Sequence, residues 1–184
     1  MAAADAASRF GSPMRLREAA PTGPSGDWTT VTADSRDTDL EAAVRERLLA
    51  EHGPLLDAVD GVADAVAERW NDSVAPERRP ATADRDAVVP AMREALAAAG
   101  ALEHLPGLLA TGADALGVGL PASPVAAPPY LVVTATGPVV RATVPDAGRL
   151  VVSLRVFDVD RSGASPRYRR LDRGVRETLT VELR

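Results

Sequence analysis

The chain has 184 residues and a formal net charge of −5, a length that suits about one domain with a sizeable core. It contains no Cys, which excludes disulfides, thiolate nucleophiles and cysteine-ligated metals. All 21 basic residues are Arg, and the lack of Lys excludes Schiff-base chemistry and a Walker-type phosphate loop.

Residues 1–36 are predicted to be a disordered tail, because Gly, Pro, Ser, Thr and Asp follow one another there without apolar periodicity. Residues 37–184 are expected to form a single α+β domain. That domain divides into a helical part over 37–118, a Pro-rich crossing over 119–129 and a sheet over 130–184. The start carries no secretory signal, and prolines interrupt the longest uncharged run, so we expect a cytoplasmic protein with no membrane partner.

The first predicted helix opens on a capping-box pattern, Thr38 with Glu41, and ends at Gly53. The second has the clearest apolar stripe, made by Leu55, Val59, Val62, Val66 and Trp70. Its opposite side carries Asp57, Asp60, Asp64 and Glu68. Carboxylates at this spacing can serve metal or acid–base chemistry, but their place opposite the apolar stripe indicates a solvated face.

The third predicted helix runs over 84–99, with Val88, Met92, Ala95, Leu96 and Ala99 facing inward. Pro90 predicts a kink or a later start for it. A fourth, shorter helix is expected to begin near Pro106.

Alternation with a period of two predicts strands over 130–136, 139–145, 149–158 and 175–183, and a fifth short strand over 167–171. Gly137 with Pro138, and residues 145–148, are the predicted turns. The fold class is therefore α+β, with N-terminal amphipathic helices packed on one face of a C-terminal four- to five-stranded antiparallel meander. A convergent polar pocket in this fold would favour an enzyme, and a flat basic sheet face would favour a binding protein.

Two Glu-His pairs, Glu51 with His52 and Glu103 with His104, lie near predicted helix ends. The two pairs could converge on a metal if those helix ends met. Neither pair has the i, i+4 spacing of a helical zinc site, so the sequence predicts no metal there.

The segment from Asp158 to Gly163 resembles the first half of an EF-hand calcium loop. Arg169 stands where that loop needs a bidentate Glu, so we interpret the segment as a flexible loop. The chain also lacks a catalytic triad, a nucleophile elbow and a dinucleotide fingerprint. The sequence thus predicts no cofactor and leans against an enzyme.

The densest positive charge lies near the end of the chain, in a segment that we call the basic segment. Its candidate interaction residues are Arg167, Tyr168, Arg169, Arg170, Arg173 and Arg176. Arg binds phosphate or carboxylate and Tyr stacks on bases, so the partner would be an acidic protein or single-stranded nucleic acid. The alternative is a solvated basic loop that discourages edge-to-edge strand pairing.

The overall composition resembles that of proteins from extremely halophilic archaea, since Asp outnumbers Glu and Ala, Val and Thr are frequent. That resemblance implies a salt-rich cytoplasm, and high salt counts against nucleic-acid binding. The charges are also uneven, because residues 1–129 carry 20 acidic and 11 basic side chains whereas residues 130–184 carry 6 and 10. We expect a small non-catalytic intracellular binding or accessory module that acts through protein–protein contacts, with a nucleic-acid binder or an unrecognised enzyme as the alternatives.

Overall fold

The computed structural model describes residues 33–70, 84–145 and 147–184. The predicted tail over 1–36 lies almost wholly outside them. The helical part contains α1 (Ala33–Glu51), α2 (Gly53–Glu68), α3 (Arg85–Ala98), α4 (Ala101–His104) and α5 (Gly107–Ala115). It is followed by β1 (Leu131–Thr134), β2 (Gly137–Val144), β3 (Gly148–Leu154), β4 (Phe157–Asp160), β5 (Arg167–Arg170), α6 (Val175–Thr178) and β6 (Leu179–Leu183).

The main sheet has four antiparallel strands in the order β1-β2-β3-β6. Strands β4 and β5 form a separate antiparallel hairpin, which is inserted in the chain between β3 and β6. Neighbours in the main sheet thus follow one another along the chain except for this insertion. The predicted α+β meander is confirmed.

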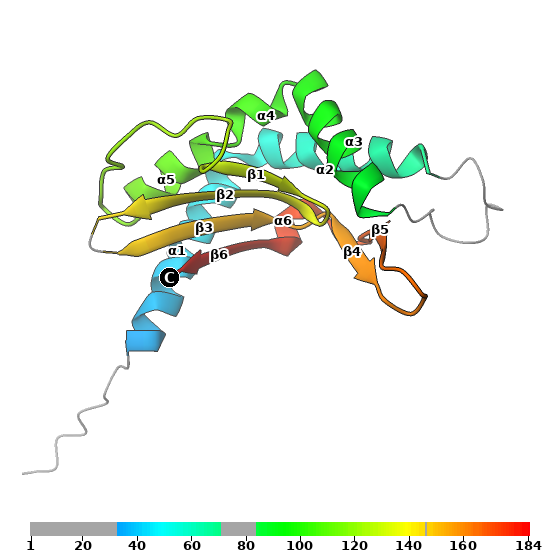
Figure 1. Cartoon of the computed structure of the whole chain (residues 1–184). Helices are drawn as coiled ribbons and strands as arrows, with labels where there is room; N and C mark the ends of the chain where they lie inside the picture. Colours follow the sequence, from blue (N-terminus) through cyan, green and yellow to red (C-terminus); the bar gives the residue numbers. More distant parts are fainter. Residues whose placement is uncertain (1–32, 71–83, 146) are drawn as a thin grey trace, which may run out of the picture. The chain divides into compact units, whose positions relative to one another are not determined.

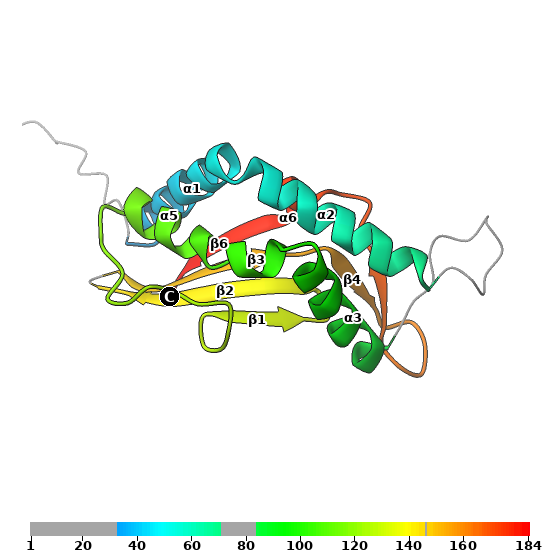
Figure 2. The same ribbon diagram turned by 90° about the horizontal axis from the view of Figure 1, so that it is seen from above.

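Helices α2 to α5 lie on one side of the main sheet (Figures 1 and 2). The strands turn Val140, Val152 and Val181, which are aligned across β2, β3 and β6, into the core. The helices contribute fully buried side chains to the same core, among them Leu48, Leu56, Met92 and Leu109. The core is built from Leu and Val as expected, and the strand periodicity leaves the opposite face of the sheet to polar and partly exposed side chains.

Helix α1 covers the outer edge of β6 through two of its side chains. The Glu41 carboxylate accepts a hydrogen bond from the backbone N–H of Leu183 at 2.7 Å, and Arg45 Nε donates to the carbonyl of Leu179 at 3.0 Å. These are backbone groups that an edge strand would otherwise offer to another chain. The predicted capping role of Glu41 is therefore wrong. Helix α1 begins at Ala33, ahead of Thr38, and the Glu41 carboxylate binds the backbone of β6 instead of the start of its own helix.

The first predicted turn is displaced by two residues. Ala135 and Thr136 form the turn, whereas Gly137 and Pro138 lie within β2 opposite Thr134 and Val133. Gly137 has φ +142°, and a Cβ there would lie 1.9 Å from the carbonyl oxygen of Leu154. Glycine is required here by the close approach of β3 and by the backbone angle.

The third helix agrees with its prediction at both ends. Asp84 accepts a hydrogen bond from the N–H of Ala87 at 3.0 Å and caps α3. The helix begins before Pro90, so the proline does not delay its start. Ala99, predicted to face inward, is exposed. Within the described parts of the chain, no helix is long and apolar enough to cross a membrane.

Candidate functional site

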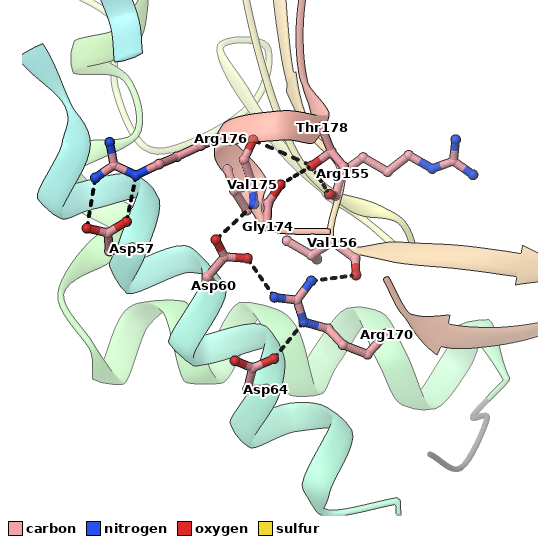
Figure 3. Close-up of polar contacts among 10 residues, drawn as sticks. All are labelled: Asp57, Asp60, Asp64, Arg155, Val156, Arg170, Gly174, Val175, Arg176 and Thr178. Atoms are coloured by element: carbon pink, nitrogen blue, oxygen red, sulfur yellow. Dashed lines mark hydrogen bonds and ion pairs between the residues drawn. The ribbon is translucent and has the colours of Figure 1, made fainter. Parts of the chain in front are cut away.

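Arg170, one of the predicted interaction residues, points into the fold. Its Nη2 donates to Asp60 Oδ1 at 2.6 Å and its Nε donates to Asp64 Oδ1 at 2.7 Å (Figure 3). A third hydrogen bond, from Nη1 to the carbonyl of Val156 at 3.2 Å, ties the same guanidinium to the chain before β4. With its side chain 12% exposed, Arg170 joins α2 to the β4–β5 hairpin.

Arg176 also contacts α2. Its Nε and Nη2 donate to the two oxygens of Asp57 at 2.8 and 2.9 Å, in the bidentate geometry that suits a guanidinium and a carboxylate (Figure 3). Asp60 uses its second oxygen to accept the backbone N–H of Val175, at the start of α6, at 2.8 Å. The carboxylates of α2 thus hold α6 and β5 against the helix.

The interpretation of this side of α2 as a solvated face is therefore wrong for Asp60, whose carboxylate is largely covered. Asp57, Asp64 and Glu68 are exposed, as that interpretation expected. The basic C-terminal part of the chain folds back over the acidic helix, so opposite charges that are far apart in sequence meet. The pairs differ in exposure, since the Asp60 side chain is 22% exposed and that of Asp57 is 62% exposed. The Arg170 pair with Asp60 is consequently the one that solvent screens least.

The remaining residues of the basic segment lie outside this contact. Tyr168 is partly buried and packs against the core, and Arg169 lies 3.7 Å from Asp158. Arg167 is opposite Asp160 in the hairpin register. Arg173 is exposed. An interaction surface on these four residues stays a prediction, and it is narrower than the six-residue surface that the sequence suggested.

The two Glu-His pairs come close enough for Glu51, His52 and His104 to line one cavity of about 510 Å³. His52 Nε2 shares a hydrogen bond with Thr111 Oγ1 at 2.8 Å. Burial lowers the pKa of His52, and the negative charge of Glu51 opposes that shift in part. Across the described ranges, no group of three or more His, Asp or Glu side chains is arranged to hold a metal.

The carboxylates of the EF-hand-like segment are engaged within the chain. Asp160 Oδ1 accepts hydrogen bonds from the backbone N–H and the hydroxyl of Ser162 at 2.9 and 2.6 Å, and these bonds lower the pKa of Asp160. Asp158 forms an ion pair with Arg155. The first three residues of the segment, Asp158 to Asp160, belong to β4, so the interpretation as a loop is wrong for them. Residues 161–163 lie in the loop of the hairpin, as that interpretation expected.

The lowered pKa values of His52 and Asp57 predict that acid destabilises the fold. His52 is favoured in its neutral form, so its contribution is complete above its ordinary pKa of 6.5 and falls as pH drops below that value. The hydrogen bonds from Arg176 lower the pKa of Asp57, whose contribution is complete above 3.8 and is lost as pH falls further. Urea unfolding from pH 8 to about pH 2 should show both declines. His52→Gln should lack the decline below pH 6.5, and an unchanged decline in that variant would contradict the assignment to His52.

The face of the main sheet that points away from α2 to α5 presents three rows of side chains across the strands. The first row contains Val132, Val139, Ser153 and Thr180, the second Arg141, Val151 and Glu182, and the third Thr143, Arg149 and Arg184. Every one of these side chains is partly or fully exposed. We call this surface the open face.

The open face is hollowed along β2 and β3. A groove of about 590 Å³ is lined by Val139, Val151 and Ser153 together with Arg141, Arg149 and Arg184. A second cavity, of about 360 Å³, adjoins it and is walled by Leu120, Pro121 and Pro129 from the Pro-rich crossing and by Tyr130, which follows the crossing. Arg141, Thr143 and Arg149 line both hollows, so they connect into one continuous surface.

The sequence contains a pattern that indicates this surface, although the prediction of interaction residues did not include it. Arg141 and Arg149 occupy outward positions of the alternating strands, but each is a single charge in an apolar run, whereas the basic segment drew attention by its density. Only the strand register brings the two arginines together. The arginines of the basic segment that bind α2 and those of the open face thus belong to different surfaces.

Comparison with known proteins identifies a family but gives no information on activity. A family model described as a domain of unknown function (DUF7988) matches residues 42–184. No curated protein and no solved structure matches the chain. The matched range contains α2, the basic segment and the whole of the open face.

Proposed function

The chain belongs to the DUF7988 family, a domain of unknown function, and from its open face we propose that it is a small non-catalytic binding or accessory module that acts through protein–protein contacts. The observation that carries this proposal is a grooved strand surface on which partly exposed valines lie beside arginines. Protein interfaces combine an apolar centre with Arg and aromatic side chains in the same way.

The three valines of the open face supply the apolar part. Val132 and Val139 are direct neighbours across β1 and β2, and Val151 lies on the next strand, opposite Arg141. A hydrogen-bonded sheet holds these side chains in place before a partner arrives, so little conformational entropy is lost on binding. The open face is therefore suited to a partner with a complementary, preformed surface.

High salt in the cytoplasm would favour apolar contacts for binding a protein partner. We place the protein in a salt-rich cytoplasm, because its composition resembles that of halophilic archaeal proteins. Exposed charges are screened within a few ångströms at high salt, whereas burial of apolar surface is not weakened. The basic segment is less suited to a nucleic-acid strand, since Arg170 and Arg176 are bound to the carboxylates of α2.

The test is to recover a partner from a lysate of the source organism, purify it and measure its affinity for variants of the open face. Val139→Thr with Val151→Thr keeps the β-branched shape of both side chains but replaces two methyl groups by hydroxyls. We expect the affinity to fall about tenfold, from the apolar area that is lost. Val125→Thr is the matched control, because Val125 is 54% exposed on the Pro-rich crossing and lies outside the open face.

A purified partner that binds the double variant as tightly as the wild type would contradict the proposal. So would a partner whose affinity falls equally with Val125→Thr. The circular dichroism spectra and unfolding midpoints of the variants should match the wild type, which separates lost binding from lost folding.

A further inference from the structure

We infer that the cavity beside Arg141 and Arg149 is a subsite for a carboxylate, supplied by an acidic segment of a protein partner. This inference rests on the proposed function and adds the chemistry of the partner to it. The subsite is the 360 Å³ cavity between the open face and the Pro-rich crossing.

The strand register places the two guanidinium groups on one side of the cavity. Arg141 lies opposite Val151, and Arg149 is two residues before Val151 in β3, opposite Thr143. The arginines are thus diagonal neighbours on the same face, with Cα atoms about 7–8 Å apart in such pairs. Two long side chains at that separation can both reach one anion between them, and the Thr143 hydroxyl is a third donor on the cavity wall.

The charge of these two arginines is uncompensated by carboxylates in the described parts of the chain. Arg184, in the same groove, donates from Nε to Glu182 at 2.7 Å and is neutralised by it. Arg141 is instead steadied by a neutral group, since its Nε donates to the carbonyl of Pro129 at 3.1 Å. Among the described residues, no hydrogen bond or ion pair occupies its two terminal amino groups or the guanidinium of Arg149. Neighbouring like charges repel, so a bound anion relieves that repulsion.

The apolar wall of the cavity selects the kind of anion. Leu120, Pro121 and Pro129 line the cavity together with the two arginines, so its space fits a carboxylate with an apolar side chain next to it in the partner. A guanidinium matches a carboxylate through two parallel hydrogen bonds. A nucleic-acid strand requires a longer track of cations, and the net charge of −5 opposes a long polyanion.

The experiment is a titration of the isotope-labelled full chain, followed by NMR at low salt, with a short acetylated peptide of alternating aspartate and leucine. The peptide is used with an amidated and with a free C-terminus. We expect amide shifts at Arg141, Thr143 and Arg149, and a loss of at least about tenfold in affinity for Arg141→Gln with Arg149→Gln, as expected for charge-assisted hydrogen bonds. Arg93→Gln, which removes an exposed arginine of α3, should bind within about twofold of the wild type.

The two peptide forms identify the source of the carboxylate. Equal affinities show that side-chain carboxylates occupy the subsite, and a tighter free form shows that the chain end does; either result supports the inference provided that the double arginine variant weakens it. A double variant that binds the peptide normally would overturn the inference. The proposed function would survive that result if the peptide or the purified partner still shifted Val139 and Val151.

A short oligothymidylate serves as the competing probe. Shifts of the same amides by this probe at lower concentration than by the peptide, with an affinity that falls steeply as salt rises, would overturn the inference in favour of nucleic acid. Absence of any shift at millimolar peptide would overturn it as well. Spectra of the variants that match the wild type away from the cavity exclude misfolding as the cause.

Discussion

Replacing Phe157 with Ala is expected to lower the free energy of unfolding by about 3–5 kcal/mol, the usual cost of truncating a fully buried aromatic side chain. Phe157 has no exposed surface and heads the fully buried side chains by volume. Its ring lies 5.2 Å from that of Trp70, tilted by 43°. Since a domain is stabilised by about 5–15 kcal/mol in total, the variant should be close to unfolding at room temperature. Urea unfolding followed by circular dichroism measures the loss.

Two matched variants make this result interpretable. Phe157→Leu keeps most of the buried volume and should cost less than half as much as the alanine variant. Trp70→Ala should also cost less, because Trp70 is only partly buried and packs at the margin of the core. A loss below about 1 kcal/mol for Phe157→Ala would mean that the β4–β5 hairpin does not pack as described. A larger loss for Trp70→Ala than for Phe157→Ala would make Trp70, which the sequence places on the apolar stripe of α2, the main aromatic anchor of the core.

Phe157 shows why strand boundaries were harder to predict than strands. The alternation of Leu150, Val152, Leu154 and Val156 continues without interruption, so residues 149–158 were predicted as one strand and Phe157 fell on its wet side. In the structure the backbone N–H groups of Val156 and Phe157 both donate to the carbonyl of Thr136, at 2.8 and 3.1 Å, and β3 has already ended. A contact with a turn from elsewhere in the chain decides the break, and periodicity contains no information about that contact.

The predicted strand over 175–183 exists as β6 but begins four residues later than predicted, for a different reason. Val175 and Leu179 are four residues apart, a spacing that places both on one face of either a strand or a helical turn. In the structure the first four residues form the helix α6, and Leu179–Leu183 form the strand β6. The side chains of Val175 and Leu179 are both buried. The burial of these residues was therefore predictable, while the local backbone was not.

The helices were predicted better because their signals are local. The apolar stripe of α2 and the cap of α3 by Asp84 depend on residues within a few positions of each other. The partners of the α2 carboxylates are over a hundred residues away in the chain. Charge asymmetry between the two parts of the sequence indicated that they could attract, but only the fold determines which aspartate meets which arginine.

Removing the Asp60 carboxylate is expected to cost about 2–4 kcal/mol, more than any other single charge on α2. Asp60→Ala leaves the backbone N–H of Val175 without its acceptor and leaves Arg170, whose side chain is 12% exposed, with Asp64 as its remaining carboxylate. The cost arises from these unsatisfied, partly buried groups rather than from lost attraction between exposed charges. Urea unfolding at constant salt measures it.

Asp57→Ala is the matched control, one turn earlier on the same helix. Its pair with Arg176 is exposed on both sides, so its loss should have a far smaller effect, and one that shrinks further as salt is added. Combining Asp60→Ala with Arg170→Met also removes the cation that has lost one of its two carboxylates, so the double variant should be more stable than the sum of the two single losses implies. Equal losses of unfolding free energy for Asp60→Ala and Asp57→Ala would mean that Asp60, like Asp57, lies on the solvated face that the sequence indicated. Additive losses in the double variant would show that Arg170 and Asp60 are neighbours without being energetic partners.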